Sequence, residues 1–216
     1  MQPSEVLSSV RSQLYETSEG FWTDAELYGY MWQAEHELAL HIRCTQAQTT
    51  TTTTTAVSMY TAPSDAMYID RVTWDSVKLK KIDRTDYDAL QRVDYGGMFT
   101  IGRPMHYYQY GDQICLWPVP AYSAAMAWDY TQVPVAITSF STAFTVPVHF
   151  HNIIQDYVLW RAFAKDQDDK RTAFYSNEWK QGLIRAAGFW NTRNGADFYR
   201  VVKEEDSYRN VELGMI

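Results

Sequence analysis

Cysteine and long apolar runs are both scarce in this 216-residue sequence. Its two cysteines, Cys44 and Cys115, are too few for a disulfide framework, which fits synthesis in a reducing cytoplasm and leaves open only a single bridge. The apolar runs fall far short of the about 20 residues that a membrane-spanning helix requires. The N-terminus lacks the basic start and apolar block of a secretion signal. We therefore expect no contact with a membrane.

Excess positive charge is also missing. The formal net charge is -7, so bulk electrostatic attraction to nucleic acid or to an acidic membrane surface is not expected. A protein that binds nucleic acid through a basic face is the functional class that this balance argues against.

Motifs for catalysis and metal binding are absent as well. The sequence has no Gly-rich phosphate loop, no nucleophile elbow and no Cys-x-x-Cys. His36 and His41 are five residues apart, whereas two zinc ligands on one helix face need a spacing of four. His149 and His151 have no evident third ligand, and the acidic run 166–169 lacks the glycine and glutamate of a calcium loop. We expect no catalytic residue, no metal and no cofactor.

What the sequence does contain is a clear β-hairpin in its middle. Two β-prone runs, 105–110 and 113–117, flank a Gly-Asp pair at 111–112 that is typical of a type II′ turn. Pro118 and Pro120 lack the N–H that a ladder needs, so we expect strand pairing to stop there. Further strands are predicted over 67–74, 77–81 and 124–131, and loop or weak strand over 139–147.

Helical periodicity is confined mainly to the two ends of the chain. Apolar residues at steps of three and four predict helices over 4–15, 23–43, 148–165 and 172–190, with a short one over 86–92.

The helix over 23–43 has the clearest start. Thr23 and Glu26 form a capping-box pattern, and Phe21 and Trp22 precede it as a hydrophobic staple. The apolar stripe is predicted to be buried and the other face solvated, with these glutamates on it: Glu26, Glu35 and Glu37.

Seven consecutive threonines occupy positions 49–55. β-branched side chains favour an extended backbone, so the run predicts a strand or an extended arm that leads to Tyr60. One interpretation is an ordinary strand with hydroxyl groups on both faces. The other is an edge strand that pairs with a neighbouring chain.

These elements predict an α+β fold in which the terminal helices pack as a bundle around an inserted antiparallel β-domain. We expect residues 1–45 and 148–190 to form the two parts of the helical domain and residues 46–147 to form the β-domain. Residues 191–216 have no clean period and are predicted to be either an arm that orders on a partner or a frayed tail.

Aromatic residues make up 15% of the chain, with eight Trp and sixteen Tyr. They suit interfaces and equally suit an ordinary aromatic core. A carbohydrate- or protein-binding module is therefore an alternative function, with Tyr107, Tyr108, Tyr110 and Trp117 as its platform. Its weakness is that such modules are nearly all β, whereas this chain is helical at both ends.

The order of motifs resembles the head-to-tail connector (adaptor) proteins of tailed bacteriophages, over about Phe21 to Trp190. The motifs that carry the resemblance are Phe21–Leu27 at a helix start, Tyr60–Trp74 with its Pro-Ser-Asp turn, Gly102–Pro104 followed by Leu116–Pro120, Tyr130–Pro134, and the junction Lys165–Asp168. The threonine run and the residues after Trp190 match no feature of that family.

The resemblance implies a structural virion protein of the neck, without catalysis. It implies a ring of about twelve copies that binds the portal protein on one side and a tail, stopper or nozzle protein on the other, with genome DNA passing through its lumen without sequence-specific binding. The expected contacts between ring subunits are Thr51, Thr53, Tyr107 and Tyr110. The expected portal-binding arm comprises Phe198, Tyr199, Val201, Val202, Tyr208 and Leu213.

Overall fold

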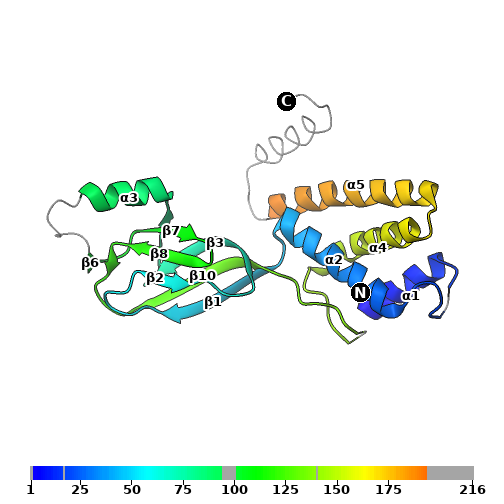
Figure 1. The fold of residues 1–216 in the computed structure, drawn as a ribbon, viewed down its shortest axis with the longest axis horizontal. Helices are drawn as coiled ribbons and strands as arrows, with labels where there is room; N and C mark the ends of the chain where they lie inside the picture. The colour runs from blue at the N-terminus through cyan, green and yellow to red at the C-terminus, as the bar shows by residue number, and fades with distance from the viewer. Residues whose placement is uncertain (1, 17, 94–100, 140, 194–216) are drawn as a thin grey trace, which may run out of the picture. The chain divides into compact units, whose positions relative to one another are not determined.

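The structure is a computed structural model that describes residues 2–16, 18–93, 101–139 and 141–193 (Figure 1). The chain divides into two compact units. The helical unit comprises Met1–Thr45 and Pro134–Ile216, and the β unit comprises Gln46–Val133. The predicted α+β fold, with terminal helices and an inserted antiparallel β-domain, is confirmed.

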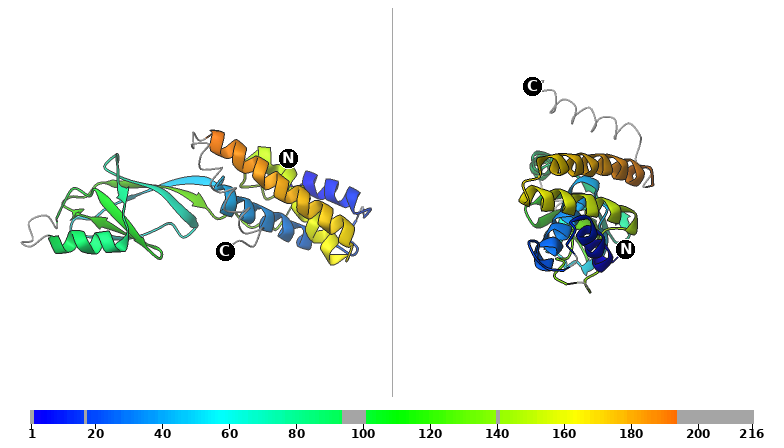
Figure 2. Two further views of the ribbon diagram at one scale, coloured as in Figure 1. Left: turned by 90° about the horizontal axis from the view of Figure 1, so that it is seen from above. Right: turned by 90° about the vertical axis from the view of Figure 1, so that its right-hand side faces the viewer.

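The helical unit contains α1 (Pro3–Gln13), α2 (Asp24–Ile42), the 3-10 turn η1 (Val148–Phe150), α4 (His151–Lys165) and α5 (Asp169–Arg193). Helix α4 packs against α1, α2 and α5, and both views of Figure 2 show α5 lying along α4. A Cβ at Gly182 of α5 would lie 3.0 Å from Ile153 Cγ2 of α4, so a glycine is needed where these helices meet.

Each of these helices presents one apolar stripe to a common core, as the periodicity predicts. Val10 of α1, Leu38 of α2 and Ile154 of α4 are all fully buried in that core, and Trp190 of α5 closes it beside Phe150. The same cluster includes the thiol of Cys44, directly after α2.

The β unit is built from two sheets and a helix. Within the described residues, one four-stranded sheet has the order β1-β10-β3-β4 and the other has the order β2-β8-β7-β5, while β6 and β9 form a small pair. The strands of the first sheet are β1 (Gln46–Thr52), β10 (Ala125–Gln132), β3 (Ala66–Trp74) and β4 (Val77–Lys78). Those of the second are β2 (Met59–Thr61), β8 (Gln113–Trp117), β7 (His106–Tyr110) and β5 (Lys80–Lys81), and the small pair is β6 (Ile101–Gly102) and β9 (Val119–Pro120).

The predicted hairpin is β7 and β8, joined by Gly111, whose φ of 56° lies in the left-handed region that glycine tolerates. Both faces of this hairpin are covered. Tyr107, Ile114 and Leu116 pack into the core between the two sheets, beside Trp74 and Trp128.

On the opposite face of the hairpin lies α3 (Arg84–Val93). Its Tyr87 ring lies 4.3 Å from the Tyr108 ring and 5.8 Å from the Trp117 ring, and Cys115 is buried beneath it. Strand β8 is therefore a buried central strand.

The threonine run begins as a strand and ends as a turn. Thr49 to Thr52 belong to β1, and the chain then turns before β2. The predicted strand over 77–81 is likewise two short strands, β4 and β5, one in each sheet, because buried Leu79 turns the chain inward between them.

Two expectations about the ends of the β-domain differ from the structure. Pro118 and Pro120 do not stop the pairing completely, since β9 pairs with β6 and the Pro120 carbonyl accepts from Ala56 N–H at 2.9 Å; proline lacks a donor but keeps its acceptor. The sequence also predicts a boundary after residue 147, whereas the compact units divide after Val133. Residues 134–147 lie with the helices because Trp32 and Glu35 of α2 bind their backbone.

Candidate functional site

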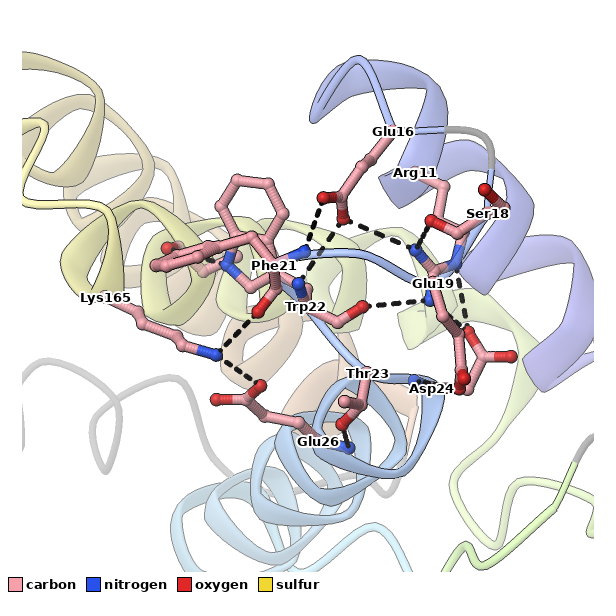
Figure 3. Close-up of polar contacts among 11 residues, drawn as sticks. Arg11, Glu16, Ser18, Glu19, Phe21, Trp22, Thr23, Asp24, Glu26 and Lys165 are labelled. Carbon is pink, nitrogen blue, oxygen red and sulfur yellow. Dashed lines mark hydrogen bonds and ion pairs between the residues drawn. The ribbon is translucent and has the colours of Figure 1, made fainter.

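Two of the motifs that carry the family resemblance, 21–26 and 165–168, meet in the helical unit although they lie at opposite ends of the chain (Figure 3). Lys165, the last residue of α4, donates from Nζ to the Phe21 carbonyl at 2.9 Å and to Glu26 Oε2 at 2.6 Å. Its amine also lies 4.6 Å from the centre of the Phe21 ring. We call this meeting point the motif junction.

Trp22 adds a buried contact to the motif junction. Its indole Nε1 donates to the Ala162 carbonyl at 3.2 Å, in the last turn of α4, where the same carbonyl also accepts from Asp166 N–H at 3.2 Å. Phe21 packs edge-on against Trp22, and its ring is 52% exposed. The aromatic pair expected as a staple before α2 therefore joins the start of α2 to the end of α4. Trp22 is buried and Phe21 is at the surface.

The capping box at the start of α2 is half formed. Thr23 Oγ1 accepts from Glu26 N–H at 3.3 Å, as predicted. The Glu26 carboxylate accepts instead from Lys165 and from the Tyr30 hydroxyl at 3.0 Å. Burial opposes its charge, but these hydrogen bonds outweigh burial and lower the pKa of Glu26.

A buried arginine fixes the loop between α1 and α2. The Arg11 guanidinium donates from Nη1 to the Ser18 carbonyl at 2.9 Å, from Nη2 to the Trp22 carbonyl at 3.2 Å, and from Nε and Nη2 to Asp24 Oδ1. Glu16 lies 3.6 Å from the same guanidinium and accepts from Phe21 N–H at 2.6 Å. The planar donor fork of arginine suits this set of acceptors, which lysine could not satisfy.

A buried glutamate fixes the segment that precedes α4. Glu35 is fully buried, and its Oε1 accepts from the backbone N–H groups of Thr145 at 2.6 Å and Val146 at 3.0 Å. Its other oxygen, Oε2, has no hydrogen-bond partner among the described residues. Burial raises the pKa of Glu35 to about 7, against the opposing effect of the two N–H donors.

This glutamate corrects an expectation. We predicted Glu26, Glu35 and Glu37 on a solvated face, and for Glu35 this is wrong. Its position, four residues after Met31 and three before Leu38, lies on the apolar stripe. Arg11 likewise follows Leu7 of the α1 stripe by four residues. For both residues, a charged side chain at a position of the apolar stripe was the sequence signal that indicated a buried charge.

The comparisons with known proteins give the family. The model of the family described as SU10 adaptor protein matches residues 1–202, which include both halves of the motif junction. The chain belongs to the SU10 adaptor protein family. A search of curated proteins finds no match. The predicted resemblance to bacteriophage adaptors is therefore confirmed, and the chain is a structural adaptor protein of a phage.

The four side chains that we predicted to contact neighbouring adaptor subunits are placed differently from one another. Thr51 is exposed on β1, and Tyr110 is 59% exposed with the Arg84 guanidinium 5.2 Å from its ring. Tyr107 is buried in the core of the β unit. Thr53 is also buried, where its Oγ1 accepts from Trp74 Nε1 at 2.9 Å and donates to the Ala124 carbonyl at 3.0 Å.

The predicted portal-binding residues lie outside the described part of the adaptor. These are Phe198, Tyr199, Val201, Val202, Tyr208 and Leu213.

The described residues of the adaptor contain no group of three or more His, Cys, Asp and Glu side chains placed to hold a metal ion. Asp168 belongs to the acidic run 166–169, which we expected not to bind calcium. It caps a helix, since its Oδ1 accepts from Arg171 N–H at 3.1 Å. No helix in the described ranges is long and apolar enough to cross a membrane. The polar clusters found here fix loops and helix ends.

Proposed function

We propose that this adaptor forms a ring in the virion neck that joins the portal protein to a tail, stopper or nozzle protein. About twelve copies make up the ring, and genome DNA passes through its lumen without sequence-specific contacts. The observation that carries the proposal is the family match over residues 1–202. The net charge of -7 agrees with a channel along which DNA slides without sticking.

The proposal assigns contacts to two regions. Thr51 and Tyr110 are exposed and contact neighbouring subunits, while buried Thr53 and Tyr107 support the strands that carry them. Residues 191–193 of the predicted arm 191–216 complete α5. The rest of the arm docks on the portal through its aromatic and aliphatic residues and orders on contact.

Electron microscopy of the adaptor mixed with the portal protein of the same phage tests the assembly. We expect a ring layered on one end of the portal, whose symmetry is then read directly. Bare portals beside a monomeric adaptor would contradict the portal contact.

A variant that ends at Arg193 tests the arm while keeping all of α5. We expect it to keep the helices of the described residues and to lose portal binding. A full-length variant with Tyr15→Ser, which removes a surface aromatic that is 83% exposed elsewhere in the helical unit, is the control and should bind the portal normally.

The carbohydrate-binding alternative gains no support from the placement of its aromatic residues. Tyr107 and Trp117 are buried, and Tyr108 is half-buried beneath Tyr87. A sugar-binding platform needs several exposed rings on one face, and here only Tyr110 of the four is exposed.

A further inference from the structure

The two sheets of the β unit have edges of opposite character. On one side, β4 and β5 are edge strands, and exposed lysines mark them: Lys78, Lys80 and Lys81. On the other side, the edge strands are β1, with the sequence QAQTTTT, and β2, with the sequence MYT. Lysine on an edge strand is a common defence against pairing with another chain. The side with β4 and β5 has this defence. On the other side, the seven-residue strand β1 has no charged residue, no proline and no bulge.

The register of β1 shows which of its backbone groups face outward. Thr53 N–H donates to the Ala124 carbonyl at 2.8 Å, and the pairing then continues without a bulge through Thr52 and Ala125 to Gln46 and Thr131. Because bonded and non-bonded pairs alternate in an antiparallel ladder, Thr51 and Thr49 face β10. The N–H and C=O groups of Thr50 and Thr52 point away from β10, at the open edge.

The threonine side chains favour a partner strand at this edge. They are stiff and β-branched, so the strand is already extended before a partner arrives. They are also identical, so another threonine-rich or uncharged strand meets the same hydroxyl and methyl groups in several registers, and cross-strand threonine pairs are favourable.

We propose that β1 pairs edge to edge with an extended strand of a second copy of this chain. The proposal rests on the proposed ring, and it identifies β1 as the surface through which one subunit receives its neighbour. Two copies that each carry a net charge of -7 repel one another, and an uncharged edge lets their backbones approach without placing like charges together. A ring needs two different surfaces on each subunit, and β1 supplies one of them.

The sharpest test is Thr50→Pro. Proline at this position removes an outward-facing N–H and leaves the ladder between β1 and β10 intact, as is typical of prolines on edge strands. We expect a folded adaptor whose yield of rings, alone or on portals, falls by roughly tenfold or more, since the lost backbone bond recurs at every subunit interface.

Thr55→Pro is the matched control within the same threonine run. Val57 N–H donates to the Thr54 carbonyl at 3.2 Å and Ala56 has a φ of 61°, so Thr55 occupies the turn position that favours proline. This variant should assemble like the wild type. If Thr50→Pro lowers the helical and strand content, the double variant Thr50→Lys with Thr52→Lys replaces it, because both side chains are exposed.

Photo-crosslinking tests the identity of the partner separately from ring formation. Benzoylphenylalanine replaces Thr50 in one variant and Lys80 of the defended side in another, each in the presence of portal protein. We expect Thr50 to give a covalent dimer of the adaptor and Lys80 to give far less.

The outcomes separate the two proposals. A wild-type adaptor that never forms rings contradicts the proposed function, and the cross-link from Thr50 then still decides whether β1 meets a second copy. Rings that form normally with Thr50→Pro, or a Thr50 cross-link that leads to the portal protein or to nothing, overturn the inference.

Discussion

The helical unit and the β unit bury different kinds of polar group. Among the described residues, the buried polar side chains of the helical unit include two charged groups, Arg11 and Glu35, together with Thr45 and His151. Those of the β unit are all threonines: Thr53, Thr73 and Thr131. The helices are thus held partly by groups whose charge matters, whereas the sheets use neutral hydroxyls. We therefore expect pH and charge removal to affect mainly the helical unit.

Arg11→Met should produce the largest loss of stability. The free energy of unfolding is expected to fall by about 3 to 4 kcal/mol, because Asp24 and two carbonyls lose a buried cationic partner. Thermal unfolding measures the loss, and hydrogen exchange should show it in α1 and α2 with the β unit unchanged. Arg161→Met, at an exposed arginine of α4, is the control. Equal losses for both variants would show that the Arg11 contacts contribute nothing special.

Glu35→Gln should stabilise the adaptor at high pH. Burial raises the pKa of Glu35 to about 7, so the folded state holds this proton more tightly than the unfolded state. Its contribution is complete below the unfolded pKa of about 4.5 and is lost as pH rises through about 7. The raised pKa corresponds to roughly 3 kcal/mol of stability lost at high pH. We expect Glu35→Gln to recover about 2 kcal/mol of this loss at pH 8, because its NH2 group, in the place of Oε2, has no hydrogen-bond acceptor among the described residues.

Unfolding curves of the wild type and Glu35→Gln from pH 4.5 to 8 measure this effect. Asp156, whose pKa burial and Glu178 raise to about 6, is present in both proteins and cancels in the difference. Gln33→Ala, a change between neutral residues on the same helix, is the control and should shift the curves equally at every pH. Parallel profiles for the wild type and Glu35→Gln would refute the assignment.

Thr53→Val should destabilise the β unit by about 1 to 2 kcal/mol, equally at pH 5 and pH 8. Valine keeps the shape but leaves Trp74 Nε1 without its acceptor and removes the bonds to the Ala124 backbone. Thr52→Val, at an exposed position of the same run, is the matched control. A loss of stability that varies with pH would contradict the expectation that pH affects mainly the helical unit.

Lys165→Met should have the smallest effect, up to about 1 kcal/mol, because its ion pair with Glu26 is partly exposed. The pKa of Glu26 should rise at the same time, since Lys165 helps to hold it down. NMR titration of the Glu26 carboxyl measures this rise, with Lys170→Met as the control. An unchanged Glu26 pKa would mean that the hydrogen bonds with the Tyr30 hydroxyl and the Thr23 backbone maintain it without Lys165.

Local signals predicted most of the fold, and long-range contacts account for what they missed. The stripe of α2, the Gly-Asp turn of the hairpin and the polar start of α5 each depend on neighbours within a few residues, so the sequence predicts them directly. Glu35 binds an N–H 110 residues away, and no local pattern predicts that partner. The same limit applies to the motif junction, which joins Phe21 to Lys165 across 144 residues.

Each unit contains one buried cysteine, and the reaction rate of its thiol reports how often that unit opens. Cys44 is 3% exposed in the core of the helical unit, and Cys115 is 1% exposed beneath α3 in the β unit. Burial raises the pKa of the Cys44 thiol to about 12, so this sulfur is protonated as well as shielded. Each thiol can react with a soluble reagent only while its own unit is open. The rates at which the two sulfurs are modified would therefore time the opening of the helices and of the sheets separately in one unlabelled, unaltered chain.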